Sequence, residues 1–449
     1  MKKFFDSVLF VVCMAICMPV LAGASAMTHV LALVVVLLAL FVPKHMVTTR
    51  NWNVHTNGLV TITETNGALG GTLQTNDGIM GFVLTGNTGD AYALGTPILV
   101  TSLAALRTGG NAITATNNYF AYRQVSDFFN NAGSGAQLYL MLVPDSMTVA
   151  DMADHTNSNG YIKLWNYAAG QCKGIMVMSD DTEVTVTTVT GVNADCYTAL
   201  TRLHAGAVAA AAADKPFFGI VGGTSYSNVI GDVTNMASGT SDNYVSLLVG
   251  DIEGPTGYSG GTAACLGFVA GMLAKLPVQR KISRTANGPL SGVSEAYVGT
   301  DTVEAAGGDI AALANKGIIT IQTYPNVSGY FFTGDPTCTV TSDDYNCIAH
   351  RRVINKAFAL AYAFGVQLID DEVPTVAGGT IDPGYAKWLQ QQFINQIKNN
   401  MVSAGECSGV NCFVDPNQNI LSNNTVNVVL QVLPVGYSTY INIMLGFEA

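Results

Sequence analysis

The residues whose types and spacing most suggest catalysis form the pattern G-x-S-x-G at Gly257–Gly261, with Ser259 at its centre. In α/β-hydrolases this pattern holds a nucleophilic serine on a sharp turn directly after a strand, and an acid and a histidine follow later in the chain. His350 and the aspartates before it at 343–344 supply that order. However, the preceding strand is expected to end near Gly250, several residues too early. A glycine-rich loop before a helix therefore explains the pattern better than a nucleophile.

Other glycines and acids give weaker indications of ligand binding. Gly222-Gly223-Thr224 follows an expected strand but matches neither phosphate-binding fingerprint, and the nearest lysine, Lys215, precedes that strand. The acid clusters at 180–181, 343–344 and 370–372 lack the spacing of a calcium loop, and the six histidines are scattered. We predict no catalytic residue, no metal site and no cofactor, and interpret the chain as a non-enzymatic protein.

Composition points to assembly rather than to catalysis. Charged residues make up 11% of the 449 residues, against roughly a quarter in ordinary soluble domains. We expect much of the surface to be covered by copies of the same chain; the alternative is a free surface of neutral threonine and asparagine. The net charge of −11 and the lack of a basic patch argue against nucleic acid, whose phosphates need neutralising cations.

Nine cysteines leave the redox compartment open. Two lie in the apolar N-terminal segment. Cys338 with Cys347, and Cys407 with Cys412, could close small loops in an oxidising compartment, but they lack the C-x-x-C spacing of structural zinc sites. We expect free thiols, with disulfides as the alternative.

Residues 1–45 differ from the rest of the chain. Lysines at the start precede an apolar run with small residues after it, as in a secretory signal peptide, and a second apolar run covers Val30–Val42. Two interpretations stay open. Either translation begins at Met46, or the segment is retained as a membrane tether.

The elements that would position any site form an α/β pattern over residues 78–290, after an N-terminal arm and first strands at 46–77. Continuous apolar runs predict strands buried on both faces of a parallel or mixed sheet. The expected strands are 78–85, 97–101, 137–143, 174–178, 217–221 and 244–249, and the expected helices are a short one capped by Ser102, one bearing Val125, Phe128 and Phe129, and those at 192–213 and 262–275. Residues 182–190 alternate and predict a hairpin arm.

The C-terminal hundred residues predict helix, helix, strand and strand. One helix covers 350–364, and a second starts at Asp382-Pro383, an N-cap acid before the best first helical residue, and runs to Met401. Alternation then predicts strands at 426–432 and 439–447. An apolar strand at the end of a chain needs a sheet to pair with, either its own or a neighbour's.

From residue 316 onward the order of features resembles contractile tail sheath proteins of phage tails and related injection machines. The features are Lys316-Gly317-Ile318 before a strand, Tyr330-Phe331-Phe332 followed by Gly334-Asp335-Pro336-Thr337, the helix start His350-Arg351-Arg352-Val353, the helix to Met401, the turn Val414–Asn419 and the final strand pair. The resemblance implies an α/β, mixed α+β, sheath-type subunit with a central α/β domain and an assembly domain at 291–449.

The resemblance also implies a mechanical function. Such subunits polymerise into a helical cylinder around an inner tube and contract to drive that tube through a target envelope. The implied partners are neighbouring sheath subunits, the inner tail tube protein, and baseplate and tail terminator proteins. The implied location is a virion tail or an injection particle assembled in the cytoplasm, with a membrane tether if residues 1–45 are retained.

In that family, terminal arms add strands to the sheets of neighbouring subunits. Carried onto this chain, the C-terminal donor strand contains Thr439, Ile441, Ile443, Leu445 and Phe447, and the N-terminal arm contains Val54 and Leu59. The donor strand could instead close a sheet in its own subunit. The alternative functions are a membrane-tethered or exported α/β serine hydrolase around Ser259, and an anchored surface protein.

Overall fold

The computed structural model describes residues 77–88, 92–107, 112–133, 135–181, 189–239, 241–253, 263–439 and 441–442. The chain divides into Met1–Val54 and His55–Ala449, and all of the described residues belong to the second unit. The predictions for residues 1–45 and for the arm at 46–77, apart from its last residue, lie outside the described residues.

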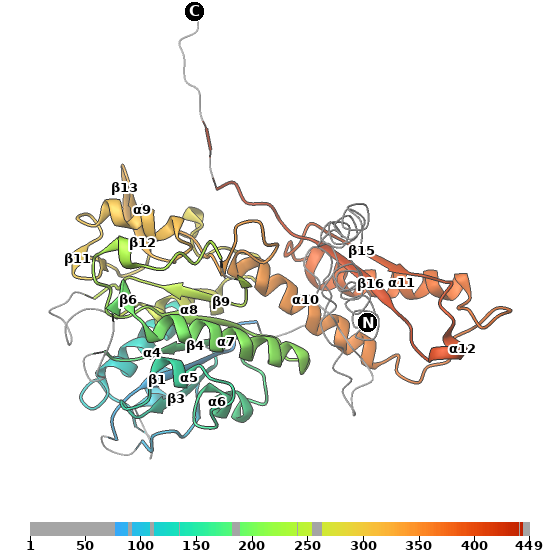
Figure 1. Cartoon of the computed structure of the whole chain (residues 1–449), viewed down its shortest axis with the longest axis horizontal. Helices are drawn as coiled ribbons and strands as arrows, with labels where there is room; N and C mark the ends of the chain where they lie inside the picture. Colours follow the sequence, from blue (N-terminus) through green and yellow to red (C-terminus); the bar gives the residue numbers. More distant parts are fainter. Residues whose placement is uncertain are drawn as a thin grey trace, which may run out of the picture. The chain divides into compact units, whose positions relative to one another are not determined.

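A six-stranded sheet forms the centre of the fold (Figure 1), in the order β2-β3-β1-β4-β7-β9. Its strands are β1 (Met80–Thr85), β2 (Ile98–Val100), β3 (Leu138–Val143), β4 (Gly174–Met178), β7 (Phe218–Gly222) and β9 (Val245–Leu248). All neighbours pair in parallel except β2 and β3, which are antiparallel. The predicted strands and the mixed α/β sheet are confirmed.

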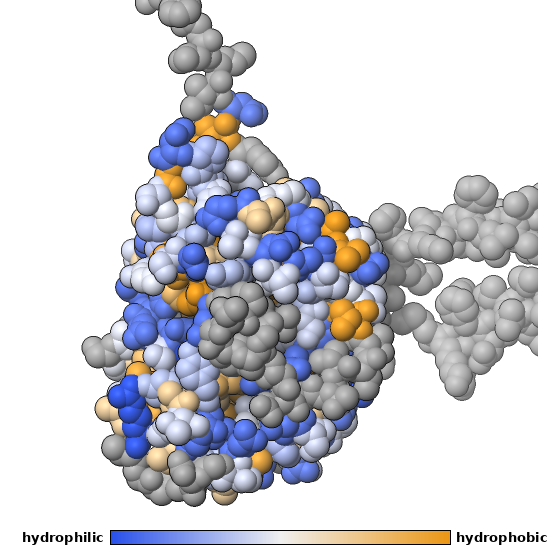
Figure 2. All heavy atoms as spheres, turned by 90° about the vertical axis from the view of Figure 1, so that its left-hand side faces the viewer, coloured by the Kyte–Doolittle hydropathy of each residue, from blue (hydrophilic) through white to orange (hydrophobic). Residues whose placement is uncertain are grey.

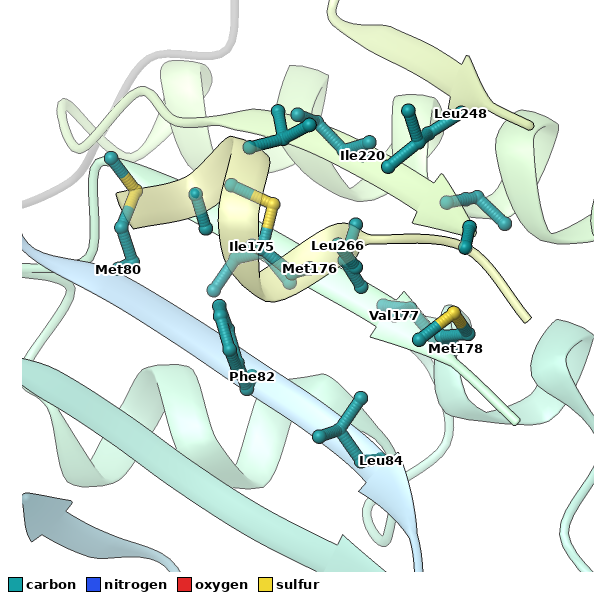
Figure 3. Close-up of a cluster of buried hydrophobic side chains, with 14 of the residues drawn as sticks. Met80, Phe82, Leu84, Ile175, Met176, Val177, Met178, Ile220, Leu248 and Leu266 are labelled. Carbon is teal, nitrogen blue, oxygen red and sulfur yellow. The ribbon is translucent and has the colours of Figure 1, made fainter. Parts of the chain in front are cut away.

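The continuous apolar runs became strands because both faces of the sheet are covered. In Figure 3, Phe82 of β1 and Met176 of β4 lie beside Leu266 of α8 (Leu266–Lys275), and Phe82 and Met176 are register partners. All three side chains are fully buried. Burial of each such side chain contributes about 1.5–3 kcal/mol.

Helices cover the sheet. The four predicted ones are confirmed as α3 (Leu103–Leu106), α4 (Tyr119–Ala132), α7 (Asp195–Ala212) and α8. Two further helices, α5 (Val149–Met152) and α6 (Tyr161–Tyr167), were not predicted. Ser102 caps α3 by accepting a hydrogen bond from Ala105 N. Helices α4 and α8 are in backbone contact, because a Cβ added at Gly267 would lie 1.9 Å from the carbonyl oxygen of Gln124.

Shorter elements surround the sheet, and several of them add residues to the same hydrophobic core. They are β5 (Val189–Thr190), β6 (Val192–Asn193), η1 (Ile230–Asp232), β8 (Ser241–Asp242), η2 (Thr285–Asn287), β10 (Tyr297–Val298), β11 (Asp301–Thr302), α9 (Gly307–Asn315), β12 (Ile321–Tyr324), β13 (Val327–Phe332) and β14 (Cys338–Thr339). Of the predicted hairpin arm only β5 is described, and it pairs with β6. Residues as late as Ile348 belong to this core. The domain boundary at 290/291 stays a prediction.

The C-terminal residues build a second hydrophobic core. Its elements are α10 (Ile348–Val366), α11 (Pro383–Ile397), a π-helical turn (Lys398–Val402), β15 (Gly409–Val414), α12 (Ile420–Asn423) and β16 (Val428–Leu433). Both predicted helices are confirmed, and the Asp382 side chain caps α11 by accepting from Gly384 N and Tyr385 N. The stripe Leu389, Phe393, Ile397 and Met401 is buried.

The pairing of the last strands differs from the prediction. β16 pairs with β15, which the sequence analysis did not anticipate. Residues 434–439 and 441–442, expected to lead into and begin a second strand, are not in a strand. Pro434 follows β16 directly, and proline cannot donate a ladder hydrogen bond. The predicted strand at 426–432 is confirmed as β16, and β15 is an additional strand before it. Most of the predicted strand at 439–447 lies outside the described residues.

Candidate assembly site

Strands β15 and β16 form a two-stranded antiparallel sheet, here called the ribbon (Figure 1). Its inner face packs into the C-terminal core, where Cys412, Val414 and Leu430 are buried. A two-stranded sheet is marginally stable alone, so this packing is what holds the ribbon in place.

The outer face of the ribbon carries exposed apolar side chains on both sides of the exposed polar pair Asn411 and Gln431. Phe413 and Val429 are register partners across the two strands, and they are 53% and 43% exposed. Leu433, at the end of β16, is 62% exposed. Within the described residues neither outer edge of the ribbon pairs with a further strand. Free edges present backbone N–H and C=O groups that template strand addition.

The chain after β16 is here called the C-terminal segment (residues 434–449), and its described residues form no strand. Thr439 is exposed and Ile441 is 75% exposed. Of the predicted donor residues only these two are described; Ile443, Leu445 and Phe447 lie outside the described residues, as do Val54 and Leu59 of the predicted arm. The donor assignment stays a prediction.

Buried cations at the start of α10 join the two cores. Arg352 donates to the carbonyl oxygens of Leu273 and Leu276, at 2.8 and 3.1 Å, and so closes the C-terminus of α8. Burial lowers its pKa to about 10. The Arg351 guanidinium lies 3.6 Å from the ring centroid of Tyr244 and 4.1 Å from that of Tyr345.

Lys356 adds an ionic link in the same place. Its ammonium lies 2.8 Å from Asp77 before β1 and 2.8 Å from Glu406 before β15. Burial alone would lower the pKa of Lys356, but its hydrogen bonds to the two carboxylates raise it. The three cations at 351, 352 and 356 therefore lie inside the fold rather than on a basic surface.

The described residues provide no support for the hypothesis of a serine hydrolase around Ser259. Ser259 lies outside them, and the His350 Nδ1 atom is 3.0 Å from the backbone oxygen of Asp344. In the described part of the chain, no group of three or more His, Cys, Asp or Glu side chains is arranged to hold a metal ion. No helix in that part is long and apolar enough to cross a membrane.

The alternative of disulfide bonds does not hold in this structure. The seven described cysteines, including Cys338, Cys347, Cys407 and Cys412, form no disulfides with each other and are buried. Burial raises the pKa of each of these thiols, to about 12 for Cys347 and about 11 for Cys407. Six of them, all but Cys347, belong to the two cores, where they act as small apolar side chains.

The face of the molecule shown in Figure 2 carries no broad apolar area. Outside the grey atoms, hydrophobic residues gather there in small groups between hydrophilic and neutral ones. The ribbon exposes Phe413, Val429 and Leu433 on one face of one sheet, which makes it a candidate contact surface.

Solved structures confirm the resemblance to sheath proteins at the level of the fold. A chain of the contracted helical sheath of the anti-feeding prophage matches with a TM-score of 0.53 and 16% identity, covering 88% of this chain and 99% of that one. A chain of the contracted PVC sheath complex, an extracellular contractile injection system, matches at 0.52 and 13%, and one of the anti-feeding prophage baseplate at 0.52 and 15%, with the same coverages. A comparison with curated proteins found no match.

Family comparison divides the chain close to where the two cores meet. Residues 58–335 match the family described as DUF2586, N-terminal domain, and residues 344–449 match DUF2586, C-terminal domain. The chain thus has the fold of contractile sheath subunits and belongs to the DUF2586 family.

Proposed function

We propose that this protein is the structural subunit of a contractile sheath, which polymerises into a helical cylinder around an inner tube. The observation that carries the proposal is the ribbon. Among the described residues both of its edges are unpaired and its outer face exposes Phe413, Val429 and Leu433, and the same chain continues into a C-terminal segment whose described residues join no strand. A surface that accepts strands and a segment that can donate one are what an open, head-to-tail array requires.

The contact between subunits is strand addition. The C-terminal segment of one subunit pairs with a ribbon edge of the next, and an N-terminal arm pairs with the opposite edge. Backbone hydrogen bonds supply strength, and alternating side chains such as Ile441 fix the register. Apolar side chains of an added strand that lie on the outer side of the sheet would flank Phe413, Val429 or Leu433, so apolar burial contributes to the contact.

The function of the array is mechanical and needs no catalysis. Strand pairs keep neighbours connected while whole subunits rotate, and contraction drives an inner tube through a target envelope as subunits bury more surface against each other. No nucleotide or cofactor is required, because the energy is stored during assembly. The proposed partners are identical subunits, an inner tube protein, and baseplate and terminator proteins of the particle.

Negative-stain electron microscopy of the purified full-length chain, and of the chain from Met46, tests the proposal. Hollow, regularly striated cylinders are the expected product, with an inner tube protein added as template where the chain alone stays dispersed. Dispersed particles with and without that template would overturn the assignment. Cylinders from the shorter chain would show that the apolar N-terminus is not needed for assembly.

A further inference from the structure

Tyr437 is the point at which the C-terminal segment touches the α/β part of the fold again. Its phenol donates a hydrogen bond of 2.5 Å to the carbonyl oxygen of Gln279. The residues on both sides of it, Gly436 and Ser438, are exposed, whereas Tyr437 is half-buried. Burial raises the pKa of this phenol well above its ordinary value, so it stays a hydrogen-bond donor at physiological pH.

Two further side chains hold the ring of Tyr437. The ammonium group of Lys281 lies 4.7 Å from the ring centroid, within cation–π distance. The imidazole of His350 lies beside the same ring, with centroids 5.5 Å apart and an interplanar angle of 34°. The ring is therefore contacted from two elements far apart in sequence.

Buried Asp335 fixes the positions of Lys281 and of the start of α10. One carboxylate oxygen lies 3.2 Å from the Lys281 ammonium, and the other accepts from Ala349 N in the first turn of α10. Asp335 is 1% exposed, so removing its charged partner would leave a costly buried carboxylate. The same aspartate thus sets both the place where α10 starts and the place of the cation that faces Tyr437.

We propose that Tyr437 is the anchor from which the C-terminal segment leaves the subunit, and that Gln279, Lys281 and His350 form its receptor. Tyr437 is a positioning residue for strand donation. It fixes the point at which the donor strand leaves its own subunit, and it makes no contact with the neighbouring subunit's sheet. The inference rests on the proposed sheath function, but the anchor can be tested on the unassembled subunit.

The anchor shortens the stretch of chain that must be ordered during assembly. Residues 438–449, when fully extended as a donor strand, span roughly 40 Å. Without the anchor the free chain would begin at Leu433, where the ribbon ends, and the residues between would have to be ordered during assembly. Ordering costs of this kind are subtracted from binding, so we expect assembly to need on the order of tenfold more protein.

The test compares full-length Tyr437→Ala with the parent chain and with Tyr167→Ala, a control at a 56% exposed tyrosine on α6. Tyr437 belongs to neither hydrophobic core, so the melting temperature of the subunit should stay the same. Hydrogen exchange and limited proteolysis of dispersed subunits should show residues 434–439 exchanging and being cleaved several-fold faster in Tyr437→Ala alone. Lys281→Met, which keeps the stem and removes the charge, should give a smaller increase.

Assembly is then measured for the same variants by sedimentation across protein concentration. Tyr437→Ala should raise the concentration at which polymer forms, and Tyr167→Ala should not. Unchanged exchange in Tyr437→Ala would overturn the anchor itself, whether or not the protein forms cylinders. Faster exchange with unchanged assembly would overturn its role in positioning the donor. Failure of every variant and the parent chain to assemble would count against the sheath function, while the exchange result would still decide the anchor.

Discussion

At the scale of single residues, the charge around Arg123 is out of balance. The guanidinium of Arg123 contacts Asp251, Asp127 and Glu253, so three carboxylates share one buried cation. Burial is the largest cause that raises the pKa of Asp127 to about 6, and the charges of Asp251 and Glu253 add to it. Because the folded state holds the Asp127 proton more tightly than the unfolded chain, this site stabilises the fold more as pH falls from 7 towards 4.

Asp127→Asn removes that charge while keeping the shape of the side chain. We expect a higher melting temperature than the parent at pH 8, corresponding to about 1–2 kcal/mol, and little difference at pH 4.5. Thermal unfolding at both pH values measures it, with Asp232→Asn, at an exposed aspartate, as a control that should change nothing. A lower melting temperature at pH 8 would mean that the Arg123–Asp127 pair outweighs the repulsion.

The buried side chain of Asn355 on α10 should lower the stability of the fold. It is 8% exposed, and neither amide atom has a hydrogen-bond partner among the described residues. It lines a small pocket with Phe218, Val278 and Ala359 and with the charged Asp77, Lys173, Arg352 and Lys356. Since an unpaired buried amide costs about 1–3 kcal/mol, Asn355→Leu should raise the melting temperature. Asn118→Leu is the matched control and should lower it, because that buried amide bonds both the N–H and the carbonyl of Asn87. A loss of stability in Asn355→Leu would show that the amide is bridged by water.

At the scale of elements, the exposed face of the ribbon should matter to assembly and not to folding. Leu433→Lys places a charge on that face, which native sheets use to prevent edge association. We expect an unchanged melting temperature and at least a tenfold loss of polymer by sedimentation, because a charge there must be desolvated on contact. Leu421→Lys is the control, since Leu421 is 72% exposed but lies on α12, outside the ribbon. Equal polymer yields for both variants would show that the ribbon face is not a subunit contact.

The elements also show what the sequence could and could not predict. The central strands were predictable because burial on both faces produces continuous apolar runs, as in Leu138–Val143. Strand β15 was missed because Gly409 and Asn411 interrupt its apolar residues on the outer face. Conversely, alternation in 439–447 states which side chains share a face but not what the strand pairs with. The receptor of Tyr437 was not predictable, since it combines residues from 279 to 437 that only the fold brings together.

At the scale of the whole molecule, the two cores are joined by many buried contacts, whereas the C-terminal segment is held by few. The α/β core and the C-terminal core are joined by buried Arg351, Arg352 and Lys356, contacts that cost several kcal/mol to break. By contrast, the described residues 434–439 and 441–442 are tied to the rest mainly through Tyr437 and form no ladder. A sheath built this way should move as whole subunits linked by strands, because the strand links bend more easily than the junction between the cores.

Deletion of both proposed arms separates folding from assembly at this scale. Removal of residues 46–57 and 439–449 takes away no residue of either described core, so the chain should keep its melting temperature and remain dispersed. Each single deletion leaves one donor, so it should allow short or irregular polymers rather than long cylinders. Thermal unfolding and electron microscopy of the three variants beside the parent provide the measurement. Normal cylinders from the double deletion would reject strand donation, and the subunit contact would then have to be sought on the faces of the two cores.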